Sequence, residues 1–347
     1  MTAEAAWLAG LEEGARARLS PELFEYVSQG AREGVTAAEA VAAWSRVRFR
    51  PRVLRDVTSL DLTVSLLGFP SAVPWGVAPT TLQRAVHPDG ELATARATAA
   101  AGGVMVVSSN AGTPFADIGA TGVRWWLQAY LPERRRLAEP LLDRAVAAGA
   151  AAVVLTADTP VVGTKYHAGR AVWETVDPET LRVNFDPGDD PAGAARKARD
   201  LGAADVAWVA ERTGLPVVVK GVLHPGDVES CLEAGAAAVW VSNHGGRQLD
   251  RAVSTAAALP AVADAVRGRA QVYVDGGLRT GLDVLAALAL GADAVFLGRL
   301  PLYALVEGEE GVSRMHAELA EQLAEALRLA GLDTVAKAWT VLDPTPI

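Results

Sequence analysis

The residues best suited to chemistry lie in one short segment, Val241–Asp250, with the sequence VSNHGGRQLD. His244 can accept a proton near neutral pH, because an imidazole has an ordinary pKa of about 6.5. Arg247 can bind a carboxylate through two parallel hydrogen bonds. Gly245 and Gly246 between them allow a tight turn. The spacing predicts a catalytic base beside a carboxylate-binding group.

The other histidines are weaker candidates for this base. His87 and His224 each precede a proline at a predicted helix entrance, and His316 falls in the last predicted helix, so structural roles are expected for these three. His167, in a long loop, is the one rival candidate. Asp158 can orient His244 and favour its imidazolium form, although a turn or helix-capping aspartate is the alternative interpretation.

Lysine is rare in this chain, which holds 32 basic residues and only four lysines, namely Lys165, Lys197, Lys220 and Lys337. Because the chain otherwise uses arginine, each lysine indicates a position where a compact ammonium is preferred to a guanidinium. Lys220 ends the apolar run Val217–Val219, and we expect it to stabilise negative charge on a cofactor. The alternative is a lysine whose stem packs in the interior while its head reaches solvent.

These residues need a scaffold, and the sequence predicts a (β/α)8 TIM barrel. Short apolar runs alternate with Ala/Leu-rich helical stretches, as parallel strands covered on both faces should. An open doubly wound sheet is the alternative, but its glycine-rich GxGxxG turn does not occur in the sequence. The predicted strands are Ala72–Pro79, Gly103–Ser109, Arg124–Tyr130, Ala151–Asp158, Leu215–Gly221, Ala236–Asn243, Ala270–Gly277 and Ala292–Arg299.

We predict that residues 1–347 form a single domain. Residues 1–71 form a helical, then irregular, N-terminal extension, and residues 72–311 form the barrel. Residues 166–200 form a long lid loop after the fourth strand. Residues 312–347 form a closing helix over Val312–Ala330 and a tail. Helices are expected within the barrel at Asp89–Ala101, Pro132–Ala148, Ala198–Thr213 and Thr280–Leu290.

In such barrels the functional groups gather at the carboxyl ends of the strands. Nearly every predicted strand here ends in a group that can hydrogen-bond or titrate, including Thr80, Ser108, Gln128, Tyr130, Thr156, Asp158, Lys220, His244 and Asp275. Gly276-Gly277 and Gly298-Arg299 follow the last two strands, where backbone N–H groups and an arginine can hold a phosphate. Tight turns that need glycine are the alternative interpretation of these two pairs.

Composition limits the partners. A net charge of -9 argues against nucleic acid and anionic membranes. No apolar run reaches the roughly 18 to 20 residues of a membrane helix, and the N-terminus does not resemble a secretory signal, so a cytoplasmic protein is expected. The single cysteine, Cys231, excludes an internal disulfide and a multi-cysteine metal site; we expect no metal and a buried thiol.

These motifs resemble the FMN-dependent 2-hydroxy acid oxidases and dehydrogenases, a family that includes glycolate oxidase, lactate oxidase, mandelate dehydrogenase and the flavin domain of flavocytochrome b2. The resemblance runs from about Phe24 to the C-terminus. Its most specific blocks are Ser242–Asp250 (SNHGGRQLD) and Asp275–Arg299 (DGGLRTG…ALGADAVFLGR). Supporting blocks are Phe24–Ala31, Phe49–Val57, Ala78–Arg96 and Leu155–Gly163.

The resemblance implies a role for each matching residue. His244 is the base and Asp158 its partner, Arg247 binds the substrate carboxylate, and Tyr26 and Tyr130 offer hydroxyls to the substrate. Lys220 stabilises the reduced flavin ring. The remaining FMN-binding residues implied are Pro79, Thr80, Thr81, Ser108, Gln128, Thr156, Ser242, Asp275, Gly276, Gly277, Arg279, Gly298 and Arg299.

Three positions depart from the family pattern. Lys165 stands where a second carboxylate-binding arginine is common, Asn110 replaces a frequent tryptophan, and Thr81 replaces a small residue near the flavin. Lys165 and Asn110 are therefore expected at a roomier substrate site that favours aryl or long-chain acids. Because Thr81 is larger than the usual residue, it can influence the reaction of O2 with the reduced flavin, and both O2 and another electron acceptor are considered.

The expected activity is FMN-dependent oxidation of an L-2-hydroxy acid to the 2-oxo acid, with O2 or another electron acceptor. The alternatives are a dehydrogenase or monooxygenase of the same family acting on a larger substrate, and a non-redox FMN barrel enzyme such as type 2 isopentenyl diphosphate isomerase. A barrel that binds flavin without turnover is a third possibility. The family resemblance suggests a homotetramer.

Overall fold

The computed structural model describes residues 7–166, 172–185 and 196–343. Eight parallel strands close into a barrel in the order β10-β3-β4-β5-β6-β7-β8-β9, so the predicted TIM barrel is confirmed. Each predicted strand is present; seven are shortened at one or both ends, and β7 starts two residues later than predicted and ends one residue later, at Val222. The strands are β3 (Trp75–Val77), β4 (Val104–Ser108), β5 (Arg124–Ala129), β6 (Val153–Thr156), β7 (Val217–Val222), β8 (Ala238–Val241), β9 (Gln271–Val274) and β10 (Ala294–Leu297).

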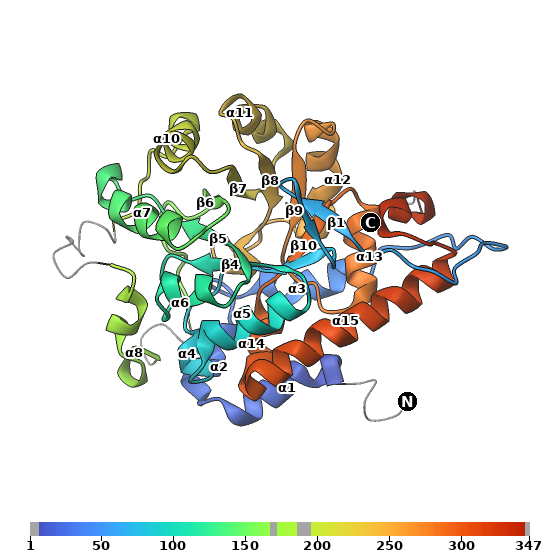
Figure 1. Ribbon diagram of the computed structural model, residues 1–347, viewed down its shortest axis with the longest axis horizontal. Helices are drawn as coiled ribbons and strands as arrows, with labels where there is room; N and C mark the ends of the chain where they lie inside the picture. The colour runs from blue at the N-terminus through green and yellow to red at the C-terminus, as the bar shows by residue number, and fades with distance from the viewer. Residues whose placement is uncertain (1–6, 167–171, 186–195, 344–347) are drawn as a thin grey trace.

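Helices surround the strands on the outside (Figure 1). The four predicted barrel helices are present, and the one expected over Pro132–Ala148 is split into a 3-10 turn and an α-helix. The helices between the strands are α4 (Gln83–Val86), α5 (Gly90–Ala100), α6 (Phe115–Ala120), η2 (Arg135–Ala138), α7 (Glu139–Ala147), α10 (Ala203–Thr213), η4 (Pro225–Asp227), α11 (Val228–Glu233), η5 (His244–Gly246), α12 (Thr255–Val266) and α13 (Gly281–Ala289).

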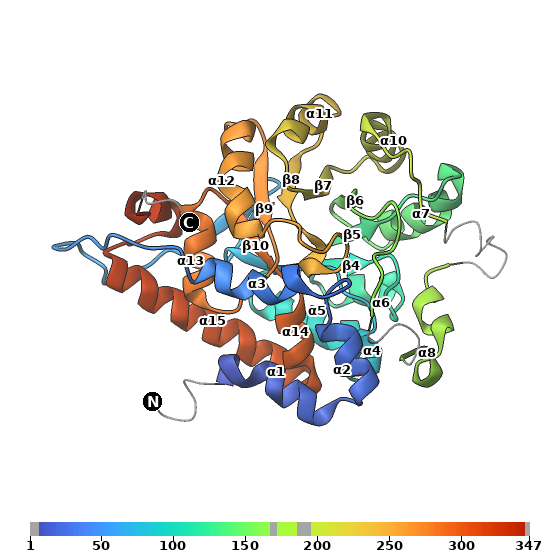
Figure 2. The ribbon, with the colours of Figure 1, turned by 180° about the vertical axis from the view of Figure 1, so that it is seen from behind.

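The chain ends pack on one side of the barrel (Figure 2). The extension supplies α1 (Trp7–Arg18), α2 (Pro21–Ser28) and α3 (Val35–Trp44). After β10 come α14 (Arg299–Ala304), η6 (Leu305–Glu307), α15 (Gly308–Ala330) and η7 (Val335–Val341). The closing helix α15 thus begins four residues before the predicted Val312. None of the helices within the described ranges is long and apolar enough to cross a membrane.

Two features differ from the sequence predictions. The extension is not irregular up to residue 71, because β1 (Val64–Leu66) and β2 (Phe69–Ser71) form an antiparallel hairpin. Leu66 from this hairpin packs into the core inside the barrel and closes its amino-terminal end. The predicted lid is not a plain loop either, since its described parts contain α8 (Val172–Thr175) and η3 (Pro178–Arg182). Residues 167–171 and 186–195 of the predicted lid loop lie outside the described residues.

The core inside the barrel forms the floor of the site. Trp126, Trp240, Tyr273 and Phe296 are buried and pack ring against ring, with centroids 4.1 to 6.2 Å apart. Such pairs add to the stability that burial alone provides. A rigid floor of aromatic rings holds the carboxyl ends of the strands in place.

Candidate active site

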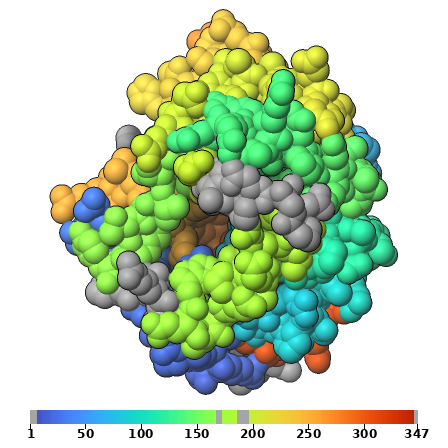
Figure 3. Space-filling view, turned by 90° about the vertical axis from the view of Figure 1, so that its left-hand side faces the viewer, coloured from blue at the N-terminus to red at the C-terminus, as the bar shows by residue number. Residues whose placement is uncertain are grey.

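The carboxyl ends of all eight strands open into one cavity of about 850 Å³. Figure 3 looks into a hollow on this side, with orange atoms from the C-terminal half of the chain visible at depth and the yellow-green segment that follows β6 at the rim. The residues that sequence analysis placed in the site and that line this cavity are Tyr26, Pro79, Thr80, Thr81, Ser108, Asn110, Gln128, Tyr130, Thr156, Lys165, Lys220, His244, Arg247, Asp275, Gly276, Gly277, Arg279, Gly298 and Arg299.

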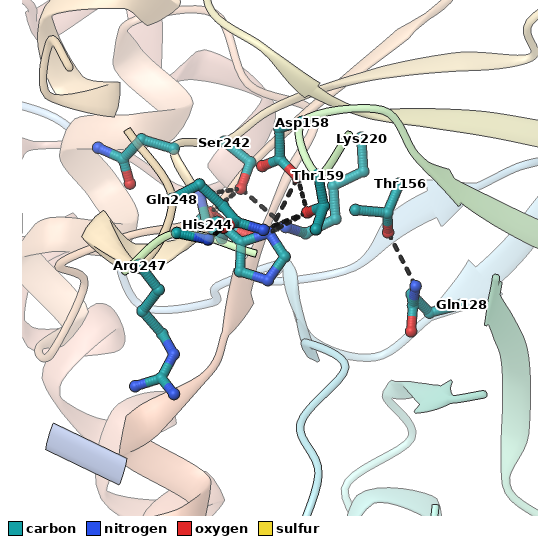
Figure 4. A network of polar contacts seen from close by, with 12 residues as sticks. Gln128, Thr156, Asp158, Thr159, Lys220, Ser242, His244, Arg247 and Gln248 are labelled. Carbon is teal, nitrogen blue, oxygen red and sulfur yellow. Dashed lines mark hydrogen bonds and ion pairs between the residues drawn. The ribbon is translucent and has the colours of Figure 1, made fainter. Parts of the chain in front are cut away.

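His244 and Asp158 form a hydrogen-bonded pair at the cavity wall (Figure 4). Nδ1 of His244 lies 2.9 Å from Oδ1 of Asp158, and Thr159 donates its hydroxyl to the same Oδ1 at 3.0 Å. His244 itself has a positive φ of 59°, which turns its ring back towards β6. The loop after β8 therefore holds the imidazole against a carboxylate from the loop after β6, across the end of β7.

A backbone irregularity in β7 makes room for Asp158. The pairing of β7 with β8 shifts register between Lys220 and Val222, and Gly221 between them has a φ of 111°. A Cβ on Gly221 would lie 2.6 Å from Cβ of Asp158, a distance that real Cβ atoms do not tolerate. Glycine is therefore required at position 221 both for its conformation and for the close approach of Asp158.

The protonation states of this pair suit a base. Burial lowers the pKa of His244. The negative charge and hydrogen bond of Asp158 raise it, but by less than burial lowers it. Burial works to raise the pKa of Asp158, but the attraction and hydrogen bond of His244, followed by Lys220, outweigh it and lower the pKa to about 2. Asp158 is thus ionised at neutral pH and accepts the Nδ1 proton of a neutral ring. That tautomer leaves Nε2 of His244 free of a proton.

A second polar network lies deeper in the barrel. The buried Lys220 donates to Oγ of Ser242 at 2.8 Å, and its Nζ lies 3.3 Å from Oδ2 of Asp275. Ser242 in turn donates to Oδ1 of Asp275 at 2.7 Å and accepts from the backbone N–H of His244 at 3.1 Å. The network joins the ends of β7, β8 and β9, so Ser242 connects the lysine to the loop that carries His244.

Arg247 occupies the side of the cavity away from this network (Figure 4). Its Nη1 donates to the backbone carbonyls of Tyr26 and Gln29, at 2.8 and 3.0 Å, where α2 ends. Its guanidinium also lies 5.1 Å from the ring centroid of Tyr26. The N-terminal extension thereby fixes the orientation of Arg247. A guanidinium held in this way is suited to a carboxylate.

The end of the cavity lined by Arg279 and Arg299 fits a phosphate. Arg299 donates to the backbone carbonyl of Ser28, next to the carbonyls that Arg247 binds. Neither Arg279 nor Arg299 forms an ion pair with a carboxylate among the described residues. Burial and then the charge of Arg299 lower the pKa of Arg279. Two like charges at one end of a cavity favour an anion between them. Gly277 and Gly298 line the same end, where backbone N–H groups can approach a phosphate.

Hydrogen-bonding side chains line the cavity between Lys220 and the outer rim. Gln128 donates to Oγ1 of Thr156 at 3.0 Å, and Ser108 donates to Oε1 of Gln128 at 3.4 Å. Asn110, at the rim, donates to the backbone carbonyl of Leu181 in η3 at 3.5 Å. The row of donors and acceptors at the ends of β4, β5 and β6 is suited to the polar edge of a flat ring system.

Sequence analysis missed Lys197 and Trp173, which also line the cavity. The Nζ of Lys197 lies 3.4 Å from the ring centroid of Tyr130, and Trp173 packs edge-on against Tyr26 with centroids 5.7 Å apart. The rarity of lysine was the signal that could have found Lys197. Lys165, Lys197 and Lys220 all line the cavity, whereas Lys337 forms an exposed ion pair with Asp333.

The remaining candidates lie elsewhere. His316 is buried and accepts a hydrogen bond from Trp75, and the rings of His87 and His224 each accept one from a backbone N–H group nearby. None of these three lines the cavity, as expected of structural histidines. His167 lies outside the described residues. The prediction of a buried Cys231 was wrong: the thiol is only partly buried, because α11 exposes one side to solvent.

Comparison with known proteins identifies the family. A model of the FMN-dependent dehydrogenases matches residues 15–341. The chain belongs to this family. It is 40% identical to glycolate oxidase 1 of Zea mays, over 93% of this chain and 91% of that protein, and 39% identical to glycolate oxidase of Spinacia oleracea, over 91% and 89%. A solved structure of a mandelate oxidase variant with (S)-mandelic acid superposes with a TM-score of 0.89, at 37% identity, over 96% of this chain and 97% of that one.

Membership in the FMN-dependent dehydrogenase family establishes FMN as the cofactor. The cavity fits it, because its basic end suits a phosphate and its row of hydrogen-bonding side chains suits a flat polar ring. The roles of individual side chains towards FMN and substrate are proposals, developed below.

Proposed function

We propose that this FMN-dependent enzyme oxidises an L-2-hydroxy acid to the corresponding 2-oxo acid. The observation that carries the proposal is a neutral His244, hydrogen-bonded to an ionised Asp158, in the same cavity as a fixed Arg247. A base and a carboxylate-binding group are what the removal of two protons and two electrons from a 2-hydroxy acid requires. The mandelate oxidase variant was solved with the (S) enantiomer of its acid, which supports the same stereochemistry here.

The side chains around His244 and Arg247 are proposed to bind the substrate and to take up its proton. Arg247 binds the carboxylate, and the hydroxyls of Tyr26 and Tyr130 hydrogen-bond the carboxylate and the reacting oxygen. Nε2 of His244 takes a proton from the substrate, and Asp158 stabilises the imidazolium that forms. Lys165 and Asn110 line the substrate side of the cavity. Burial, followed by the charge of Asp158, raises the pKa of Tyr130, so its hydroxyl stays protonated and can donate.

The other cavity residues, together with the fully buried Ser242 behind the cavity wall, would hold the cofactor. FMN, when bound, supplies the acceptor for the two electrons that leave the substrate. Arg279, Arg299, Gly277 and Gly298 would hold its phosphate, and Asp275, Ser242 and Gly276 its ribityl chain. Ser108, Gln128, Thr156 and the backbone of residues 79–81 would hold the ring. Lys220 would stabilise negative charge on the reduced ring.

The overall reaction balances with O2 as the second substrate. The 2-hydroxy acid loses two electrons and two protons to become the 2-oxo acid, and O2 takes up both to become H2O2. Thr81 lines the cavity beside the proposed ring position, so oxygen must pass a larger side chain there than alanine or glycine. We propose O2 as the acceptor, with an artificial dye or a quinone as the alternative.

The purified holoenzyme tests this function. It should convert members of a panel of (S)-2-hydroxy acids to 2-oxo acids, identified by mass spectrometry, with one H2O2 formed per 2-oxo acid. Turnover with a dye but without H2O2 would assign a dehydrogenase instead. A product in which the hydroxy acid has also lost carbon dioxide would assign a monooxygenase. Conversion of none of the panel under either condition would refute the proposal.

Assembly and location complete the proposal. Val53, Leu54, Leu329 and Trp339 are 69 to 99% exposed. The backbone N–H of Arg52 donates to Ala330 O, which brings Val53 and Leu54 to the end of α15 that carries Leu329. Exposed apolar clusters of this kind mark protein–protein contacts. We propose a homotetramer, which light scattering after gel filtration tests. A cytoplasmic location stays a prediction, for cell fractionation to decide.

A further inference from the structure

Lys197 introduces a cation at the substrate side of the cavity that the reaction proposed above does not use. The side chain is half-buried, and its Nζ stands over the face of Tyr130 at 3.4 Å from the ring centroid. Within the described ranges Lys197 forms no ion pair, whereas Lys220 pairs with Asp275 and Lys337 with Asp333. Its backbone is held in place by pairing with Pro132 and by the hydrogen bond from Ala198 N–H to Leu131 O at 2.8 Å.

Lys165, unlike Lys197, uses its ammonium group in hydrogen bonds to the backbone. Its Nζ donates to the backbone carbonyl of Gly163 at 2.7 Å and to that of Arg247. Two of its three N–H groups therefore join the loop after β6 to the loop after β8. Lys165 acts as a clamp between these loops, which leaves Lys197 as the cation that faces the cavity beside Tyr130.

The surroundings of Lys197 favour a negatively charged ligand group. A second cavity of about 200 Å³ lies next to the main one, and both are lined by Tyr130, Thr156 and Lys197. Lys197 therefore stands where the two meet, with space for a substrate side chain. Asp158 is the acidic residue whose charge acts on Lys197, but it holds His244, and no ion pair between Asp158 and Lys197 is found among the described residues. Burial, opposed by the charge of Asp158, lowers the pKa of Lys197 to about 8, so a substrate anion would stabilise the ammonium.

From this geometry, and resting on the proposed function, we propose that the substrate is a 2-hydroxy acid with a second carboxylate at the end of its side chain, bound by Lys197. Arg247 would bind the carboxylate next to the reacting carbon, and Lys197 the distal one. Arg199 also lines the second cavity but is exposed to solvent, so the half-buried Lys197 is the cation that faces the substrate. A carboxylate is favoured over a phosphate because one ammonium matches one negative charge, whereas phosphates are more often held by arginine forks.

Matched substrates test the proposal. (S)-2-hydroxyglutarate and (S)-2-hydroxyvalerate have chains of the same length and differ in the charge at the far end. We expect kcat/KM of the holoenzyme to be at least about tenfold higher for the dicarboxylate, since a hydrogen bond to a charged group contributes about 10- to 100-fold in binding. Lys197→Gln should lower that ratio by about the same factor, and Lys197→Arg should restore most of it.

Two controls separate charge recognition from packing. Lys337→Gln removes an exposed lysine far from the cavity and should leave the ratio unchanged. The dissociation constants of 2-oxoglutarate and 2-oxovalerate can be measured on the oxidised holoenzyme from the change in flavin absorbance. They should show the same preference for the dicarboxylate without turnover. If Lys197 only packs on Tyr130, Lys197→Gln will weaken both acids equally, and the proposal is wrong.

The outcome also separates this proposal from the proposed function. Wild-type enzyme that oxidises 2-hydroxyvalerate as well as or better than 2-hydroxyglutarate would overturn the assignment of Lys197 and leave 2-hydroxy acid oxidation standing. Enzyme that oxidises no 2-hydroxy acid would overturn both.

Discussion

Asp158→Asn should slow oxidation of the 2-hydroxy acid strongly while leaving the fold intact. Asparagine fills the same space beside His244 but carries no charge, so it cannot stabilise the imidazolium that forms when Nε2 accepts a proton. It can also present its N–H₂ group to Nδ1, which favours the wrong tautomer.

The size of the effect follows from the pKa of the carboxyl. The pKa of Asp158 falls from an ordinary 3.8 to about 2, despite the opposing effect of burial. A fall of nearly two pKa units corresponds to roughly 2 to 3 kcal/mol. His244 supplies the largest part of the lowering, with smaller parts from Lys220 and Thr159. By linkage, the charge of Asp158 favours the protonated form of His244 by an amount of this order. We therefore expect the chemical step to slow by roughly 100-fold.

Stopped-flow absorbance under anaerobic conditions measures this step directly as the rate of flavin bleaching at saturating substrate. Asp205→Asn is the matched control, because Asp205 is also a buried carboxylate in a hydrogen-bonded ion pair, with Arg135, but does not line the cavity. The control should bleach at the wild-type rate. A threefold loss or less in Asp158→Asn would refute the role of Asp158 as the partner of the base.

Three further predictions address Arg247, the proposed phosphate site and the cavity lysines. Arg247→Lys should lower kcat/KM by about 10- to 100-fold, because an ammonium cannot form two parallel hydrogen bonds to a carboxylate; steady-state kinetics showing less than a twofold loss would contradict it. Arg279→Gln should weaken FMN binding by about 10- to 100-fold, measured by fluorescence titration of apoprotein; unchanged affinity would place the phosphate elsewhere. Burial lowers the pKa of both Lys165 and Lys197 to about 8, and the charge of Arg247 contributes for Lys165. Since only the ammonium form attracts an anion, 2-oxoglutarate affinity should be constant below about pH 7 and fall above about pH 8, whereas a rise with pH would refute the assignment.

The fold was predictable because the eight strands are apolar runs and the helices between them are rich in alanine and leucine. The β1–β2 hairpin was missed because each strand has three residues and only Gly68 marks the turn. The start of α15 was misplaced because the positive φ of Gly308, where the helix begins, is not visible in a helical pattern.

The site was predictable where a motif carried it. His244 and Arg247 share one segment, and the strand ends placed Lys220 and Asp275 near them. The place of Lys197 was not predictable, because it depends on how the segment after β6 returns to pair with residues 131–132. The clamp formed by Lys165 was equally hidden, since its partners are backbone carbonyls, which leave no mark in the sequence.

The central claim is that His244 is the base in an FMN-dependent oxidation of 2-hydroxy acids. Its most direct test is anaerobic mixing of wild-type and His244→Gln holoenzyme, each with its FMN content measured, with the best (S)-2-hydroxy acid of the panel. We expect the wild-type flavin to bleach within a single turnover and the variant, with FMN still bound, to bleach at least about 100-fold more slowly. A His244→Gln enzyme that bleaches at the wild-type rate would contradict the account.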